Sequence, residues 1–318
     1  MKIRRGIRAA TAVLLLASAV VACGSGSAKT KNGLGTTELK VGTLPIVDDA
    51  PFFIAQRDGY FAHEGLNVHQ ETLANGAAGL VRLQSGSIDL AWTSYPTVVN
   101  AEASHATTVR IAVDGYAARP HLFPILTARS SGIRTAADLA GKKLAVNSLK
   151  GLGPLMLAAA GIPKSVKLTE IPFPHEPAAL QSHAVDAIWV TEPFATEVSQ
   201  AMPTREVADT SGGKSADLPI AGFSVSGKAL KKYPKAIAAF QRAMARAQRT
   251  AQDRKKVEQI LPTYVKGLTA QTAAKIVIGH YPTSTSRKRL QHVADLMSKY
   301  KLIKHPLNFG RLLVPAPS

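Results

Sequence analysis

The pattern of hydrophobic and polar positions divides the first third of the chain into short alternating segments. Residues 38–43 alternate between apolar and polar types, which is typical of a half-buried strand. Residues 77–85 instead carry apolar side chains at helical spacing. Continued along the chain, the pattern predicts strands at 38–43, 67–73, 87–92 and 108–114, and helices at 51–60, 61–64, 77–85 and 96–103. This alternation favours a mostly parallel sheet with crossover helices, and therefore the α/β class.

The same alternation then begins again. Strands are predicted at 121–128, 143–147, 166–171 and 185–190, and helices at 151–160, 176–182 and 193–201. Two successive α/β units predict two lobes, each a mostly parallel sheet flanked by helices. We place lobe one at residues 38–120 and lobe two at 121–218, and we assign 219–318 to lobe one as its second part.

The last third of the chain has a different pattern. One strand is predicted at 219–226, and the chain is helical after it. Over residues 234–254, four apolar side chains share one helix face, as core residues do: Ile237, Phe240, Met244 and Ala247. Further helices are expected at 271–280 and 287–301. This helical tail is expected to pack on lobe one, so the chain would cross twice between the lobes and form a hinge.

The N-terminus reads as an export signal. Residues 1–8 contain four cations and no acid, and the apolar run 9–22 has the length of a signal-peptide core. The run ends at Cys23, the only cysteine, in a context that resembles a bacterial lipobox. The resemblance implies a signal peptide at 1–22, a lipid on Cys23 and a tether at 23–37. A signal anchor with an ordinary buried cysteine is the alternative, and general secretion and the twin-arginine route both stay open.

Composition limits the remaining function classes. The formal charge is +18, which becomes +14 without the four cations of the leader, and aromatic residues make up 6% of the chain. A nucleic-acid partner is not expected for a secreted chain without a recognition motif, so the basic surface fits anionic lipid head groups or an anionic ligand. A lone cysteine excludes an intrachain disulfide, and the nine histidines lack metal-ligand spacing. We therefore expect neither a cofactor nor a metal.

Eight short stretches resemble one protein family. They lie at 41–45, 50–55, 59–66, 83–90, 131–135, 138–143, 185–188 and 192–194. In this order they are similar to the nitrate/sulfonate/taurine and thiamine-pyrimidine-precursor type of periplasmic binding protein, over about residues 38–310. The resemblance implies a two-lobed type II periplasmic binding protein, monomeric and extracytoplasmic, lipid-anchored to the outer face of the cell membrane. It also implies a small-molecule ligand and two partners, an ABC permease and its ATPase.

Candidate ligand-binding residues lie where predicted strands end, because open α/β sheets bind ligands outside the carboxyl ends of their strands. The candidates are Asp48, Asp49, Asn75, Trp92, Thr93, Ser94, Asn147, Ser148, Phe173 and Glu192.

Several candidates also have a purely structural interpretation. Two carboxylates at Asp48 and Asp49 would repel a sulfonate or nitrate and favour an amine or an amino-heterocycle, unless one is solvated and the other caps a helix. Ser94 is equally suited to helix capping, and Glu192 to a helix dipole. Trp92 could stack on a flat ligand or belong to the core. The same choice applies to Trp189, while Asp89 and Asp186, inside strands, are interpreted as structural.

We therefore expect an extracytoplasmic solute-binding protein, with a nitrogenous planar compound or a sulfonate as ligand. A sensory lipoprotein that uses the same cleft is the alternative. An enzyme acting on a heterocycle is less favoured. A fungal pyrimidine-precursor synthase resembles this fold, but its cysteine-rich motif is absent here, as are Gly-x-Ser-x-Gly and HExxH motifs.

Overall fold

The computed structural model describes residues 36–105 and 108–317. The expected signal peptide at 1–22, the lipid site at Cys23 and all but the last two residues of the expected tether lie outside the described residues. The described residues belong to one compact unit, which contains two five-stranded sheets. No helix in the described ranges has both the length and the apolar character to cross a bilayer.

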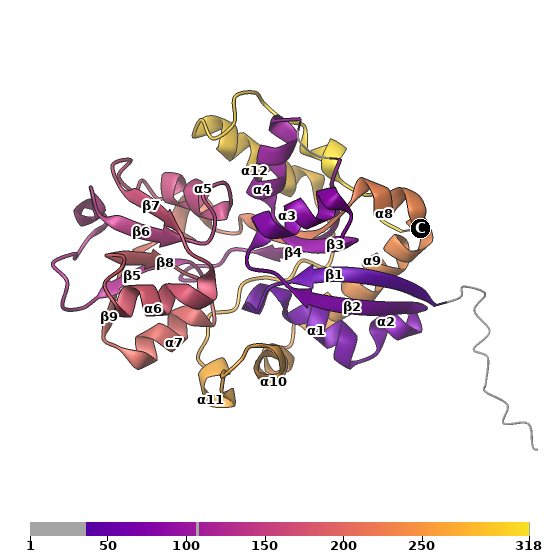
Figure 1. Ribbon diagram of the computed structural model, residues 1–318, viewed down its shortest axis with the longest axis horizontal. Coiled ribbons are helices and arrows are strands. Elements are labelled where there is room, and N and C mark those ends of the chain that lie inside the picture. Colours follow the sequence, from indigo (N-terminus) through magenta and orange to yellow (C-terminus); the bar gives the residue numbers. More distant parts are fainter. Residues whose placement is uncertain (1–35, 106–107, 318) are drawn as a thin grey trace, which may run out of the picture. The chain divides into compact units, whose positions relative to one another are not determined.

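The first sheet has the strand order β2-β1-β3-β10-β4 (Figure 1). Its strands are β1 Thr37–Thr43, β2 Leu66–Thr72, β3 Leu90–Ser94, β4 Arg110–Ala117 and β10 Pro219–Val225. Strand β1 pairs in parallel with β2 and β3, whereas β10 runs antiparallel to both of its neighbours. All seven residues of β10 are buried, so the sheet has its core at the strand that comes last in the chain.

The second sheet repeats this arrangement with the order β7-β6-β8-β5-β9. Its strands are β5 Pro124–Ala128, β6 Lys143–Val146, β7 Lys167–Glu170, β8 Ala187–Trp189 and β9 Thr204–Asp209. Here β5 is the antiparallel strand. In both sheets the antiparallel strand is the first one after the chain has left the other sheet. Strands β4 and β9 each end on the side of their sheet where the parallel strands have their carboxyl ends. The chain then enters the other sheet from the corresponding side. The first strand that it forms there, β5 or β10, therefore runs opposite to its neighbours. The predicted mostly parallel sheets are confirmed, with one antiparallel strand each.

Helices cover the faces of both sheets. Those of the first two thirds are α1 Ala50–Arg57, α2 Tyr60–His63, α3 Gly76–Ser85, α4 Tyr95–Ala103, α5 Leu152–Ala159, α6 Glu176–Gln181 and α7 Phe194–Ala201. Short 3-10 turns lie at Val47–Asp49, Ala136–Leu139, Phe173–His175 and Gly213–Ser215. Gly86, in the left-handed conformation with φ +72°, ends α3 and turns the chain back toward the sheet, as its place in the sequence predicts.

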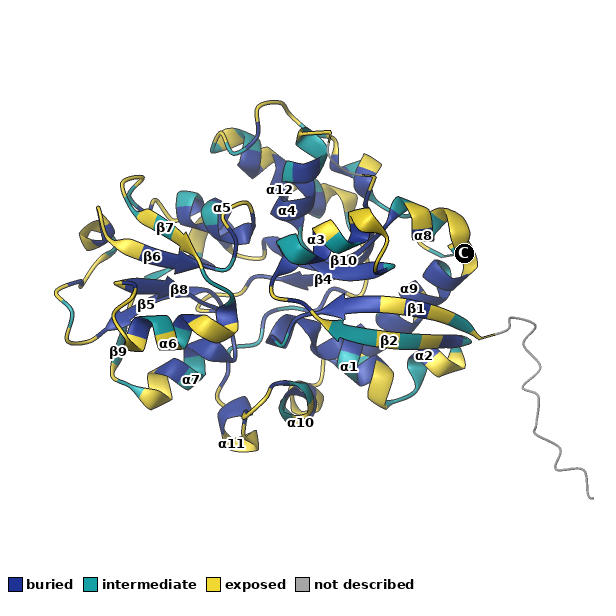
Figure 2. Cartoon of the chain, viewed as in Figure 1, coloured by how far each residue is buried: buried dark blue, intermediate teal, exposed yellow. Residues whose placement is uncertain are grey.

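The tail is helical and packs on the first sheet's helices. It contains α8 Gly227–Lys232, α9 Pro234–Thr250, α10 Arg254–Tyr264, α11 Ala270–Ala273, α12 Arg287–Lys299 and a 3-10 turn at Phe309–Leu312. Helix α9 lies against α1, α2 and β4, and α12 lies against α4. The predicted stripe on α9 is fully buried (Figure 2), and Phe240 contacts Phe61 and Phe223 with ring centroids 5.3 Å apart in both pairs. The packing predicted for the tail is confirmed.

Two sequence predictions differ from the structure. The helix predicted at 271–280 ends at Ala273, because backbone N–H groups farther on are bound by other elements. Val277 donates to Glu192, Gly279 donates to the Tyr116 hydroxyl, and His280 pairs with Ala117. The sequence does not predict strand β9, because its six residues, five half-buried and one exposed, lack the alternation of apolar and polar types that marks a strand.

Two aspartates perform the same structural task in the two sheets. Asp89 precedes β3 and accepts a hydrogen bond from the backbone N–H of Lys40, 2.9 Å away. Asp186 precedes β8 and accepts one from the backbone N–H of Lys143, 2.8 Å away. Each carboxylate thus fastens a loop to the neighbouring strand, which confirms the structural interpretation of both residues.

Candidate functional site

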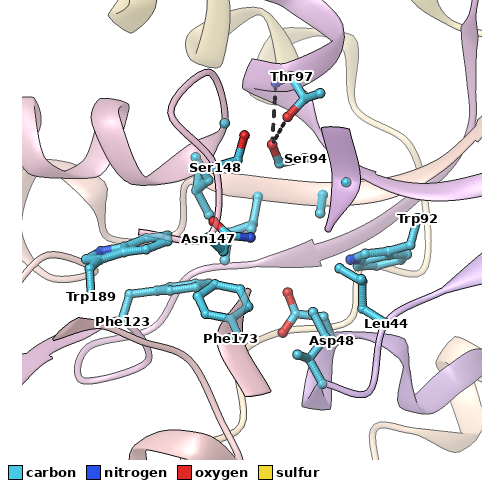
Figure 3. Close-up of a pocket in the computed structure, with 16 residues that line it drawn as sticks. Leu44, Asp48, Trp92, Ser94, Thr97, Phe123, Asn147, Ser148, Phe173 and Trp189 are labelled. Carbon is cyan, nitrogen blue, oxygen red and sulfur yellow. Dashed lines mark hydrogen bonds between the residues drawn. The ribbon is translucent and has the colours of Figure 1, made fainter. Parts of the chain in front are cut away.

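A cavity lies at the carboxyl ends of the strands, between the two sheets (Figure 3). The total volume of the cavity that is free of protein atoms, including the solvent at its opening, is about 410 Å³. The centre of a water molecule can move through only about 30 Å³ of that space, which is room for one or two waters. Of the predicted ligand-binding residues, the structure brings six to its wall: Asp48, Trp92, Ser94, Asn147, Ser148 and Phe173.

Aromatic side chains from both sheets form much of the wall. Trp92, on β3, is almost fully buried, with its ring against Phe223 at a centroid distance of 5.1 Å. On the second sheet's side, Trp189 stacks on Phe123 with centroids 4.8 Å apart and planes 10° apart, and Phe173 lies 5.8 Å from Trp189. Both tryptophans therefore belong to the core and also line the cavity. Flat apolar walls of this kind suit a planar ligand.

Among the described residues that line the cavity, Asp48 is the only ionisable one. It lies in the 3-10 turn after β1, and its carboxyl group points toward Phe173 and Asn147 (Figure 3). Only 2% of the residue is exposed, and Oδ1 has no hydrogen-bond partner. Burial raises the pKa of the Asp48 carboxyl to about 8. The cavity therefore contains a carboxyl group that is mostly protonated at neutral pH and has an acceptor atom available.

The backbone of this turn is fixed by two tyrosines from the tail. The Tyr264 hydroxyl donates to the carbonyl oxygen of Ile46 over 2.9 Å, and the Tyr281 hydroxyl donates to that of Val47 over 2.7 Å. Both tyrosines come from the segment that follows α9, so the tail holds the Asp48 side chain in position. Sequence reasoning missed them because their partners lie more than 200 residues away along the chain.

Asp49 is buried behind the cavity wall and does not line it. Its Oδ2 accepts a hydrogen bond of 2.6 Å from the backbone N–H of Leu44. Burial, and to a smaller extent the charge of Asp48, raise the pKa of Asp49 well above its ordinary value. Neither aspartate is solvated, so the predicted alternative of one solvated carboxylate and one helix cap does not describe this pair.

Polar atoms of the loop after β6 face the same space. Asn147 contributes a buried side-chain oxygen without a partner, and Ser148 lies next to it on the wall. Asn75 is outside the wall and holds this loop, because its amide donates to the carbonyl oxygen of Asn147 over 3.1 Å. Its own oxygen accepts from the backbone N–H of Ala78 and so caps α3. Ser94 both lines the cavity and caps α4 through Thr97.

Thr93 and Glu192 do not line the cavity. The Thr93 hydroxyl is buried against Ser224, with 2.6 Å between the two oxygens. The Glu192 carboxylate accepts hydrogen bonds from the backbone N–H groups of Thr196, at 3.1 Å, and Val277, at 3.0 Å. Burial raises the pKa of this carboxyl, and these hydrogen bonds oppose the rise.

The backbone of Glu192 also reaches the first sheet. Its carbonyl oxygen accepts a hydrogen bond of 3.2 Å from the N–H of Val47, next to Asp48. Glu192 therefore joins the end of β8 to both the Asp48 turn and the tail.

Trp189, for which the sequence left open a ligand contact or a place in the core, also lines the cavity. The other wall residues are small or apolar and gave no signal in the sequence. They are Leu44, Ile46, Gly76, Thr97, Phe123, Gly151, Leu152, Ile220 and Ala221. No lysine, arginine or histidine is among the described residues of the wall. In the part of the chain that the structure describes, no three His, Cys, Asp or Glu side chains are placed to hold a metal ion. The arrangement can bind a small solute through ring contacts and hydrogen-bond acceptors.

A family model described as NMT1/THI5 like matches residues 47–255, which is 209 of the chain's 318 residues. The chain belongs to the NMT1/THI5-like family. The match includes the Asp48 turn, the loop after β6 and Glu192, and so it covers the cavity described above apart from its first wall residues. No curated protein sequence matches this NMT1/THI5-like chain significantly.

Solved structures share the fold of this NMT1/THI5-like protein. The alkanesulfonate-binding protein SsuA from Xanthomonas axonopodis pv. citri, bound to MOPS, has a TM-score of 0.73 at 20% identity, over 89% of this chain and 100% of that chain. The periplasmic nitrate-binding protein NrtA from Synechocystis PCC 6803 has a TM-score of 0.67 at 17% identity, over 89% and 92%.

A gene product of Candida albicans with the generic periplasmic binding protein fold has a TM-score of 0.72 at 14% identity, over 88% of this chain and 97% of that chain. The predicted periplasmic binding protein fold is therefore confirmed for this NMT1/THI5-like chain. At identities this low the likeness shows the fold, and two of the named neighbours, SsuA and NrtA, are described as binding proteins.

Proposed function

We propose that this NMT1/THI5-like protein is an extracytoplasmic solute-binding protein that captures a small molecule between its two sheets and delivers it to an ABC permease with its ATPase. The observation that carries the proposal is the cavity at the junction of the two sheets. Its two unpartnered acceptors come from opposite sides, Asp48 from the first sheet and Asn147 from the second. A buried acceptor without a donor costs free energy, and a solute that supplies donors to both removes that cost.

Capture requires the two sides to move relative to each other. The space for water centres, about 30 Å³, is too small for a six-membered ring, so the rims must separate before a solute can enter. We propose that the moving parts are the two lobes predicted from the sequence. Lobe one comprises residues 38–120 and 219–318, and lobe two, residues 121–218, moves relative to it. The chain passes between the sheets twice, after β4 and after β9, and these two crossings are the hinge we propose.

The wall chemistry favours a planar nitrogenous solute over a sulfonate. A sulfonate or nitrate needs cationic or N–H donors, and no cationic side chain is among the described wall residues. Asp48 and Asn147 instead offer oxygen acceptors, between walls built from Trp92, Phe123 and Phe173. We therefore propose as ligand-contacting residues Asp48, Trp92, Ser94, Asn147, Ser148 and Phe173, with Asn75, Asp49, Thr93 and Glu192 supporting them from behind.

We further propose that the protein is a monomer exported by its leader and held at the outer face of the membrane by a lipid on Cys23. The sequence around Cys23, with an apolar run before it and a small-residue stretch after it, supports this anchor. Labelling with a radioactive fatty acid tests it, because Cys23→Ser should abolish incorporation.

A thermal-shift screen of the full chain against amines, sulfonates and heterocycles tests solute capture. A compound that fits should raise the melting temperature in a saturable way, since binding to the folded state stabilises it. Asn147→Leu, which replaces an acceptor on the wall, should reduce that shift strongly. Asn67→Leu is the matched control, because Asn67 lies on the edge strand β2, outside the cavity wall, and its amide donates to the Glu38 carboxylate of β1. If no compound shifts the wild type differently from the Asn147 variant, the cavity is not the binding site.

A further inference from the structure

Four exposed lysines gather within eight residues of the tail. Lys228, Lys231 and Lys232 lie on α8, and Lys235 lies in the first turn of α9. We call these four residues the lysine face. None of them forms an ion pair with a carboxylate in the part of the chain that the structure describes. The Lys232 amine lies 4.6 Å from the centroid of the Tyr233 ring.

Acids near the lysine face are few and engaged elsewhere. Glu64 lines a groove beside Lys232 and Lys235, and its carboxylate is bound by the Arg242 guanidinium over 2.6 Å. Asp89 is close enough to act on the charge of Lys232, but its Oδ2 accepts from the backbone of Lys40. The lysine face thus presents a local excess of positive charge.

The lysine face lies where the described chain begins. Thr37, the first residue of β1, lines this groove together with Lys232, Tyr233 and Lys235, and the centre of a water molecule can move through about 250 Å³ of it. In Figure 1, α8 and the start of β1 lie at the same end of the first sheet, away from the second sheet. Thirteen residues separate Cys23 from Thr37. Cys23 and Thr37 are thus fourteen steps apart along the chain, and at a maximum of roughly 3.5 Å per step a lipid on Cys23 would keep this end of the sheet within about 50 Å of the bilayer.

We propose that the lysine face rests on the anionic head groups of the membrane to which the protein is anchored. The proposal rests on the lipid anchor within the proposed function. Charge complementarity and the place where the chain leaves the body select this partner over an acidic protein. A lysine close to an anionic surface strengthens association by about five-fold, and added salt screens the effect.

The groove beside the lysines suits this contact. Its floor includes Leu66, Ala236 and Ala239, which give the lysine stems an apolar surface to lie on while their amines reach phosphate groups. The membrane would then hold the body by one end of the first sheet, with the cavity mouth at the junction of the two sheets left accessible to solute.

Amine-reactive footprinting of the lipidated full chain on vesicles tests the proposal. On vesicles of phosphatidylglycerol and phosphatidylcholine, the four lysines should be labelled about five-fold more slowly than on pure phosphatidylcholine. High salt should restore the faster rate. The second sheet carries a matched set of four exposed lysines, Lys142, Lys143, Lys164 and Lys167, whose labelling should not change. Equal protection of both sets, or protection on neutral vesicles, would overturn the proposal.

Variants that remove the lysine charges provide a second test, in which the labelling rate of Lys40 is measured. Lys40 is exposed on β1, the strand that begins beside the lysine face. We therefore expect Lys40 to be labelled more slowly on anionic vesicles as well. Replacing all four lysines of the lysine face by Gln should abolish the slow labelling of Lys40 on anionic vesicles, and replacing the matched set on the second sheet should leave it. If the first variant keeps the protection of Lys40 but no longer supports import, the lysine face binds a protein partner and the proposal is wrong.

Failure of the proposed function is detected separately. Intact mass reports whether Cys23 carries lipid, and thermal shift without vesicles reports solute binding by each variant. If Cys23 is not acylated, the anchor fails. Sedimentation of the unacylated chain with anionic vesicles then decides the lysine face alone, since loss of binding in the Gln variant supports it and unchanged binding refutes it.

Discussion

The protonation of Asp48 makes solute binding depend on pH in a direction that identifies the solute. Its carboxyl is buried, has an unpartnered oxygen and has a pKa raised to about 8. A solute that donates N–H groups, or carries a positive charge, binds the carboxylate form, so binding releases the proton. The apparent Kd then exceeds its high-pH limit by about 11-fold at pH 7 and about 100-fold at pH 6, by the linkage between protonation and binding. Affinity therefore rises with pH up to about 8 and is constant above it.

Calorimetric titrations across this pH range measure the effect directly. Repeating them in buffers of different ionisation enthalpy counts the protons released, and we expect close to one per solute at pH 6 to 7, well below the carboxyl's pKa of about 8. Asp48→Asn should bind with a Kd that no longer varies over this range. The control is Asp295→Asn, because Asp295 is exposed on α12, away from the cavity wall.

An anionic solute would give the opposite slope, since a sulfonate favours the protonated carboxyl and loses affinity above about pH 8. That slope would refute the proposed solute class. A flat profile in the wild type would refute a role for Asp48 in the site.

Three further substitutions test the site and its support. Phe173→Leu should weaken solute binding about three- to ten-fold by calorimetry while the melting temperature of the free protein changes little, and an unchanged Kd would remove the ring from the site. Glu192→Ala leaves the N–H groups of Thr196 and Val277 without an acceptor and should lower the free energy of unfolding by about 2–4 kcal/mol in urea titrations. Glu192→Gln keeps an acceptor and should cost less than half as much, so equal losses would contradict the role of these bonds. Gly222→Ala should destabilise the first sheet by at least about 2 kcal/mol, because the added Cβ would lie 2.0 Å from a backbone oxygen of β4, and a wild-type melting temperature would contradict that packing.

Local patterns were sufficient for most of the fold. Helical and alternating periodicity identified the two α/β units, and the buried stripe on α9 was predicted from spacing alone. The end of the predicted helix at 271–280 could not be predicted, because the groups that stop it, Glu192 and Tyr116, are distant in sequence. Strand β9 lacked the apolar alternation that local reasoning requires, and its place beside β5 is a tertiary effect.

Part of the candidate site could be predicted because the carboxyl ends of neighbouring strands meet at one side of each sheet. The rule that ligands lie beyond the carboxyl ends of strands brought Asp48, Trp92 and Phe173 into one group, and all three line the same cavity. The same rule cannot separate a side chain that points into the cavity from its neighbour behind the wall, as the pair Asp48 and Asp49 shows. Their roles in binding stay predictions.

Native mass spectrometry of the protein isolated from its producing cells shows directly whether the cavity captures a solute. We expect one small molecule per chain, recovered chemically unaltered, with an absorbance typical of a nitrogen-containing ring and a much lower occupancy in the Asn147→Leu variant. If the protein carries and takes up no small molecule, or returns the compound chemically changed, it is not a solute-binding protein of the kind proposed.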